Sequence, residues 1–237
     1  MYAALNTPAG NQPFNDWFVP DTIQRFALGT KVQAVDPFWG WGEFVYGKAS
    51  GAITPRLLCV FDELFQAVGV PNTANQGFPC CVAMGSMATA TFGWFMVAGL
   101  TPIKAGATVA ADVSVGITGV GQIGAFAAGK QLVNARNRIA QTGTKVLTNV
   151  QTTNGSGVIV TNGYDGWYLG IAITGTGIPA SSVAAKLDPD GRSVTLGSVV
   201  GTFDKTCTAT GSISATGTHT GFSICLIAYP FAQGQIT

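Results

Sequence analysis

The sequence predicts an all-β protein, and three observations support this prediction. Short apolar stretches alternate with clusters of Gly, Thr, Asn and Pro, as strands alternate with turns, and glycine alone supplies 32 of the 237 residues. Several stretches have the period of two that is typical of strands, for example Lys31–Val35. Only residues 55–70 have the spacing of an amphipathic helix. We therefore expect a β-barrel or sandwich core domain, an inserted second small β-sandwich-like domain and an extended N-terminal arm.

The arm is expected to comprise residues 1–28. Recurrent Pro and Asn residues make this segment irregular, yet it carries four large aromatic side chains, which are preferentially buried: Phe14, Trp17, Phe18 and Phe26. The arm either folds back on its own domain or docks on a neighbouring subunit. We favour docking and assign these four side chains to a capsid or subunit contact.

The core domain is expected to combine residues 29–147 with residues 221–237. Trp39 and Trp41 would project to one face of an extended segment, where they form either a sugar-stacking platform or, as we prefer, a core or subunit contact. The expected strands are Lys31–Val35, Glu43–Tyr46, Phe78–Ala83, Thr89–Ala98, Ala107–Val109, Val113–Ile117 and Gln131–Val133.

The segment from Pro55 to Val70 allows two structures. Its apolar residues fit helical spacing, with Asp62 and Glu63 on the opposite face, which favours a short amphipathic helix. The alternative is a β-hairpin with strands Leu57–Phe61 and Phe65–Val70. Neighbouring Asp62 and Glu63 face apart in either structure, so they do not predict a pair of catalytic carboxylates.

Residues 148–220 are rich in Thr, Ser and Gly and are expected to form the inserted, outward-facing domain. Phe222–Tyr229 is continuously apolar, which is typical of a buried strand, so we assign it to the core domain. Asp190-Gly191 predicts a hairpin turn. The expected strands are Gly157–Val160, Trp167–Ile173, Ser182–Leu187, Ser193–Leu196 and Thr206–Ser214. The aromatic residues that could form a recognition surface are Tyr164, Trp167 and Tyr168.

Two nucleotide-binding patterns nearly occur between residues 119 and 131. Gly119, Gly121 and Gly124 give G-x-G-x-x-G, but no Asp or Glu follows before Asp165 to bind a ribose. The pattern G-x-x-x-x-G-K ends in Lys130-Gln, without the Ser or Thr that would hold magnesium. We interpret these glycines as β-turn residues and expect no cofactor.

Composition excludes several classes of function. Charged residues make up 10% of the chain, against about 25% in typical domains, and the net charge is +1, so no electrostatic argument supports nucleic acid or an acidic membrane as partner. Little charge also predicts that other chains cover much of the surface. There is no apolar run long enough for a membrane span and no signal-peptide pattern at the start.

The reactive residues do not predict an enzyme. The five cysteines cannot all pair within the chain, and we expect free, buried thiols in a protein made in a reducing cytoplasm. The single histidine, His219, lies in a Thr/Gly run and predicts no metal site. No set of base and nucleophile is evident.

The order of certain segments resembles a known family. GTKVQAVDPFWGWGEFVYGKASGAI, GFPCCVAM, FGWFMVAGLTPIKAGATVAADVSVGIT and GKQLVNARNRIAQTGT occur in an order similar to that of capsid decoration (cement) proteins of tailed phages. The resemblance covers roughly Phe26–Thr144 and Phe222–Tyr229, and it implies that Leu57–Val70 is a hairpin. Residues 170–196 are similar to a small β-module of phage and bacterial surface proteins, whose turn matches Gly175–Ala180.

The resemblance implies a virion structural protein, with no catalytic residues to carry over. We expect it to lie on the capsid exterior, to bind and bridge major capsid subunits, and to form a homotrimer. The alternative is a virion-surface fibre or adhesin module that binds carbohydrate through the aromatic residues of the insert.

Overall fold

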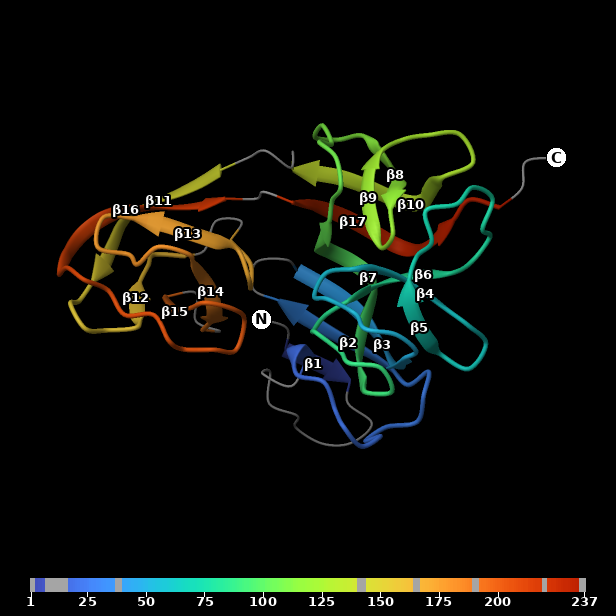
Figure 1. Ribbon diagram of the computed structural model, residues 1–237, viewed down its shortest axis with the longest axis horizontal. Helices are drawn as coiled ribbons and strands as arrows, with labels where there is room; N and C mark the ends of the chain where they lie inside the picture. Colours follow the sequence, from blue (N-terminus) through green and yellow to red (C-terminus); the bar gives the residue numbers. More distant parts are fainter. Residues whose placement is uncertain are drawn as a thin grey trace. The chain divides into compact units, whose positions relative to one another are not determined.

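The computed structural model describes residues 17–36, 40–139, 144–163, 167–188, 192–218 and 221–234, together with the backbone of residues 3–6. Within these ranges the regular structure consists of β-strands and no α-helix, which confirms the all-β prediction. The chain forms two compact units (Figure 1). The first contains residues 2–141 and 221–237, and the second contains residues 142–220.

A ring of five strands forms the centre of the first unit. The pairing order is β3-β5-β4-β6-β7, and β3 also pairs with β7, which closes the ring. The strands are β3 (Gly40–Ala49), β5 (Gln66–Gly69), β4 (Leu58–Phe61), β6 (Cys80–Ala83) and β7 (Phe92–Lys104). The closed ring leaves few unpaired strand edges in this part of the unit.

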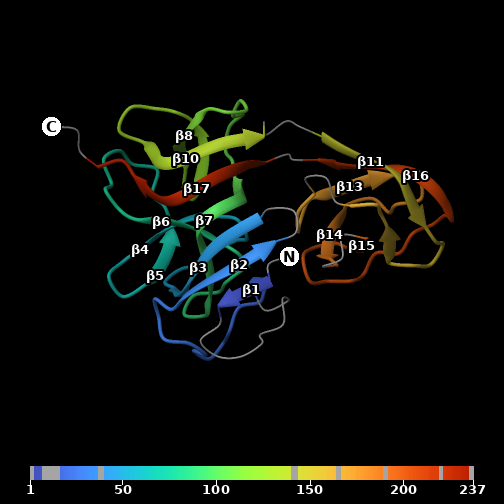
Figure 2. The same cartoon turned by 180° about the vertical axis from the view of Figure 1, so that it is seen from behind.

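The remaining strands extend the sheet on both sides of the ring. β2 continues from β3 and carries β1 at the edge, while β17 continues from β7 and leads through β10 and β8 to β9. Both views of the ribbon show β17 lying between β7 and β10 (Figures 1 and 2). The strands are β1 (Ala3–Asn6), β2 (Lys31–Asp36), β17 (Phe222–Ala232), β10 (Gln131–Ile139), β8 (Ser114–Gly119) and β9 (Gln122–Ala125).

Strands of the ring are buried on both faces. Val45 and Phe95 belong to one hydrophobic cluster, whereas their neighbours Phe44 and Met96 belong to another. Because successive residues of a strand face opposite sides, a strand between two cores must be apolar at every position. This explains the uniformly buried β4 and β6 and nearly all of β7.

The described part of the predicted arm packs on its own unit. Trp17 is 5% exposed and contacts the rings of Phe44 and Trp94, with centroids 4.6 and 4.9 Å away. Asp21 exchanges two backbone hydrogen bonds with Phe92. β1 pairs with β2. For Trp17 the structure supports the alternative that the arm folds back on its own domain, because the core supplies the apolar surface that its ring needs.

The ambiguous segment is a hairpin, β4 followed by β5, as the resemblance implied. The Asp62 carboxylate stabilises the turn, because its Oδ1 accepts hydrogen bonds from the backbone N–H groups of Leu64 (2.9 Å) and Gln66 (2.8 Å). Phe65 has a φ of +56°. The helical spacing was misleading because both strands contribute side chains to buried surfaces on two sides.

The second unit is a closed six-stranded barrel and not the sandwich-like domain that the sequence predicted. The order is β11-β12-β15-β14-β13-β16, and β16 pairs back to β11. Its strands are β11 (Thr144–Thr152), β12 (Val158–Val160), β13 (Ala172–Gly175), β14 (Ser182–Leu187), β15 (Ser193–Gly197) and β16 (Gly211–Thr218). Because β11 begins at Thr144, residues 144–147 belong to the barrel and not to the predicted core domain.

Paired strands carry the connections between the two units. On the first unit, Ile139 at the end of β10 lies opposite Ile224 near the start of β17. On the second, Thr144 at the start of β11 lies opposite Thr218 at the end of β16. The barrel is thus inserted between two neighbouring antiparallel strands.

Of the glycines in the two nucleotide-like patterns, Gly121 and Gly129 lie at turns, as interpreted from the sequence, whereas Gly119 ends β8 and Gly124 lies within β9. Gly121 (φ +66°) is in the tight turn between β8 and β9, and Gly129 (φ +72°) is in the turn before β10. A strand follows each turn, whereas both nucleotide motifs require a helix.

Several predicted strands were misplaced. Ala107–Val109 is a loop, because the Asn137 side-chain amide donates to the carbonyls of Val109 (3.3 Å) and Ala110 (2.6 Å) and so replaces a strand partner. The predicted strand from Trp167 begins only at Ala172 (β13), after a turn at Gly170 with φ +87°. The Asp190-Gly191 turn and His219 lie outside the described residues.

Candidate functional site

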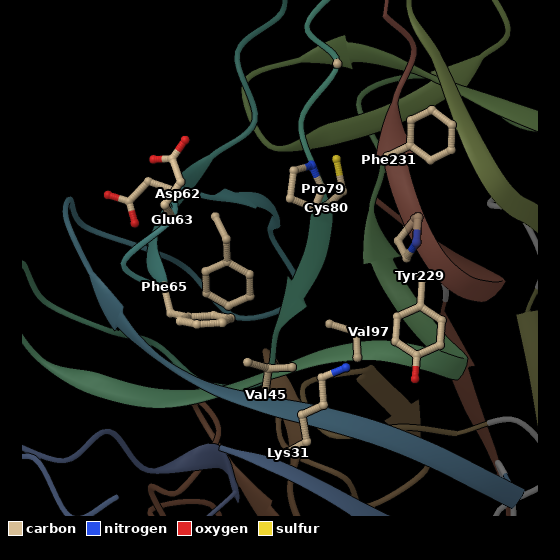
Figure 3. Close-up of a pocket in the computed structure, with 13 residues that line it drawn as sticks. Lys31, Val45, Asp62, Glu63, Phe65, Pro79, Cys80, Val97, Tyr229 and Phe231 are labelled. Atoms are coloured by element: carbon tan, nitrogen blue, oxygen red, sulfur yellow. The ribbon is translucent and has the colours of Figure 1, made fainter. Parts of the chain in front are cut away.

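A cavity of about 550 Å³ opens at one end of the five-stranded ring, and we call it the β17 cleft (Figure 3). Two ring strands form its floor through Val45 and Val97, and Figure 3 shows β17 on one side and the β4–β5 turn on the other. The full lining is Lys31, Val45, Phe61, Asp62, Glu63, Phe65, Gly77, Pro79, Cys80, Val97, Tyr229, Pro230 and Phe231.

The cleft exists because two strands diverge from β7. The pairing of β6 with β7 ends at Val82–Met96, and the pairing of β17 with β7 ends at Ala228–Ala98. Beyond these points the ends of β6 and β17 meet through a bridge between Pro79 and Phe231. Tyr229 has a φ of +51°, at a register shift between β10 and β17. A bulge of this kind redirects side chains, which brings the end of β17 to the cleft.

A buried carboxylate outside the lining, that of Glu43, contacts two residues of the cleft wall. The Tyr229 hydroxyl donates a hydrogen bond of 2.5 Å to Oε1 of Glu43, which is 6% exposed. Lys31 Nζ lies 3.6 Å from the same oxygen and 5.2 Å from the centroid of the Tyr229 ring. The hydrogen bond to Glu43, followed by burial, raises the pKa of Tyr229 to about 12. Tyr229 therefore keeps its proton at neutral pH and acts as a donor that fixes the wall.

The opposite rim is acidic. Asp62 and Glu63 lie together there, across the cleft from Lys31 and Tyr229 (Figure 3). Asp62 is engaged in the turn, whereas Glu63 is exposed and forms no ion pair with any residue that the structure describes. A second hollow of about 490 Å³ adjoins this rim and shares Glu63 and Phe65 with the cleft. Its remaining lining is Leu28, Lys48, Leu64 and Gln66.

The aromatic residues predicted for a capsid or subunit contact are dispersed. Trp17 is buried, and Phe18 and Phe26 are partly buried against the same core. Trp41 is exposed on β3. Phe14 and Trp39 lie outside the described residues. Of the described four, only Trp41 is classed as exposed.

The predicted recognition surface of the insert is not present at the two residues that can be placed. Trp167 and Tyr168 are 0% and 1% exposed, and the Trp167 Nε1–H donates to the Lys145 carbonyl at 3.0 Å. Both rings serve the barrel core, so the prediction that they are exposed for stacking is wrong. Tyr164 lies outside the described residues.

The residues of the cleft were missed because the sequence favoured a fully buried strand at residues 222–229. In the structure Leu226, Tyr229 and Phe231 are exposed. Pro230 gave one available signal, since proline inside a strand indicates an edge or a bulge. The proximity of the β4–β5 turn to this strand had no signal in the local sequence.

The thiols are buried and protonated, as free thiols in a core should be. All five cysteines are free and buried. Burial raises the pKa of Cys80 and of Cys225 to about 12. Cys80 and Cys81 belong to different hydrophobic clusters. These cysteines are therefore poor nucleophiles at neutral pH.

The described residues contain neither a candidate metal cluster nor a candidate membrane-spanning helix. Within these ranges no group of three His, Cys, Asp or Glu side chains is placed to hold a metal ion. The same ranges contain no helix that is long and apolar enough to cross a membrane. Comparisons with protein-family models, with curated proteins and with solved structures found no match to this chain.

Proposed function

We propose that this chain is a virion structural protein that binds the outside of a capsid and bridges neighbouring major capsid subunits. The observation that carries the proposal is exposed apolar surface on a chain with little charge. In the first unit, side chains that are 39 to 66% exposed include Trp41, Leu64, Phe78, Tyr229 and Phe231. Apolar side chains that are exposed together, as Tyr229 and Phe231 are at the β17 cleft, are typical of surfaces that other chains cover.

The energetics suit an assembly with many copies. A large apolar side chain contributes about 1.5 to 3 kcal/mol when it becomes fully buried. Association costs about 4 to 15 kcal/mol before any surplus remains, so a few such side chains give a weak single contact. Bridging two subunits joins weak contacts in one molecule, and the second contact then forms at a high effective concentration.

The described carboxylates support a structural role over catalysis. Most of them stabilise the fold: Asp112 pairs with Arg138 (3.1 Å), and Asp204 accepts hydrogen bonds from the Ser198 hydroxyl and backbone N–H (both 2.7 Å). Glu43 is held by Tyr229 and Lys31. These contacts give the carboxylates a structural role, whereas a catalytic acid or base needs a reacting group within hydrogen-bond reach and a pKa near the working pH.

The adhesin alternative has less support. Its aromatic platform depended on the insert, and the two described rings of that set are in the barrel core. The proposed homotrimer and the location on the capsid exterior rest on the family resemblance of residues 26–144 and 222–229.

Co-sedimentation with capsids assembled without this chain tests the proposal. We expect saturable binding, and we expect the decorated capsids to melt at a higher temperature than bare ones. Saturable binding without thermal gain would favour a display or adhesin role, and a glycan array would then be the next experiment. Absence of binding would refute both roles on the virion surface.

A further inference from the structure

We propose that the β17 cleft binds an extended segment of a partner chain in which an apolar side chain stands close to a Lys or Arg. This inference rests on the proposed function, in which the chain attaches to other chains, and it specifies the surface and the chemistry of that attachment.

The floor of the cleft is suited to an apolar side chain. Val45 and Val97 lie at the bottom, and Phe231 closes one side (Figure 3). The volume of about 550 Å³ is within the range of about 300 to 1,000 Å³ that is typical of binding pockets. An extended segment fits such an opening because alternate side chains point to the same side.

The charges around the cleft favour a cation. The ammonium group of Lys31 is compensated by the buried Glu43 carboxylate, 3.6 Å away. Asp62 and Glu63 on the opposite rim have no cationic partner among the described residues. The cleft therefore has an excess of negative charge, on the side that faces solvent. A Lys or Arg near the apolar anchor would complement it, whereas an acidic segment would be repelled.

The aromatic walls are fixed before any partner binds. Tyr229 is held by its hydrogen bond to Glu43. Phe65 is held from two sides: its ring centroid lies 5.9 Å from that of Phe61, and a Cβ on Gly29 would come within 2.5 Å of its ring. Walls that are already ordered lose little freedom on binding, which favours affinity.

The first experiment selects ligands without assuming a partner. A displayed library of random peptides, about twelve residues long, is panned against the full chain, and enriched peptides are synthesised and titrated by fluorescence anisotropy. We expect enriched sequences that combine an aromatic or branched aliphatic residue with a nearby Lys or Arg. Enrichment of acidic or uncharged sequences, or no enrichment, would overturn the inference.

Variants then locate the binding site. Glu63→Lys should weaken the selected peptides about tenfold, because it replaces an attraction with a repulsion. Asp112→Lys makes the same charge change at another exposed site and also breaks the ion pair with Arg138, so its melting temperature is measured alongside; it should leave binding unchanged. Phe231→Ser should weaken binding at least about tenfold. Its control is Phe126→Ser, since Phe126 is another exposed aromatic residue of the first unit.

The two proposals fail in different ways. Glu63 is exposed on a turn, so Glu63→Lys leaves the core intact, and an unchanged melting temperature verifies this. If this variant binds both the peptides and the capsids as well as the wild-type chain does, the cleft is not the contact, although the capsid role stands. If the wild-type chain selects basic, apolar peptides but binds no capsid, the capsid role is wrong and the cleft serves another partner.

Discussion

Replacement of Trp17 by Ala should destabilise the first unit strongly. The indole is 5% exposed and contacts Phe44 and Trp94 at centroid distances of 4.6 and 4.9 Å. A buried aromatic side chain removes on the order of 200 Å² from water, worth about 5 kcal/mol at ~25 cal/mol/Å². Alanine retains part of this and leaves a cavity, so we expect a loss of about 3 to 5 kcal/mol.

Urea unfolding provides the assay, with separate probes for the two units because two-state behaviour is not guaranteed for a chain with two cores. The transition of the first unit should move to lower urea, while that of the barrel stays in place. Ile23→Ala is the control, because Ile23 lies in the same segment but is 78% exposed. It should change stability by less than about 0.5 kcal/mol.

If Trp17→Ala lowers the free energy of unfolding by less than about 1 kcal/mol, the prediction is wrong, since removal of a buried aromatic side chain from a packed core causes a larger loss. It would mean that residues 17–28 are not part of the core. The interpretation that this segment docks on a neighbouring subunit would then regain support.

Three further outcomes are expected. Replacing residues 142–220 by a short turn should leave a folded first unit, because the strands on either side of the insert are already paired. Circular dichroism and sedimentation check this. Aggregation of the shortened chain would contradict it. The Tyr229 pKa of about 12 lies above the usual value of about 10, so its hydrogen bond stabilises the fold fully below pH ~10 and is lost as the pH rises towards 12. Across this window the melting temperature should fall more steeply with pH for the wild type than for Tyr229→Phe. Equal slopes would exclude the bond. Gly121→Ala should lower the free energy of unfolding, measured by chemical denaturation, by at least about 1 kcal/mol more than Gly155→Ala does. Both glycines have a positive φ, but only at Gly121 would the new Cβ meet a side chain, 2.3 Å from Leu57. Equal losses would show that this contact is absent.

Local patterns predicted much of the fold. Alternating residues located β2 at Lys31–Asp36, and the continuously apolar stretch after residue 221 was correctly returned to the first unit as β17. Gly121 and Gly129 of the near-motifs were recognised as turn residues because residues essential to the nucleotide motifs were lacking. These successes depend on residues close together in the chain.

The candidate site was not predictable in this way. Tyr229 and Glu43 are 186 positions apart, and their hydrogen bond depends on how β3 and β17 both pair with β7. Trp167 was predicted to be exposed, because it is an aromatic residue in a polar segment. In the structure its ring is buried in the barrel. Composition does not specify which aromatic residues a small core uses.

The sequence by itself determined the all-β class, the free thiols and the scarcity of charge, because turn residues, strand periodicity and composition act locally or over the whole chain. The tertiary structure alone decided that Trp17 is core, that the insert closes into a barrel, and that an apolar cleft with an acidic rim lies beside β17. The physical reason is that burial and proximity depend on the pairing of distant strands, and a strand's own residues set its faces but not its partners.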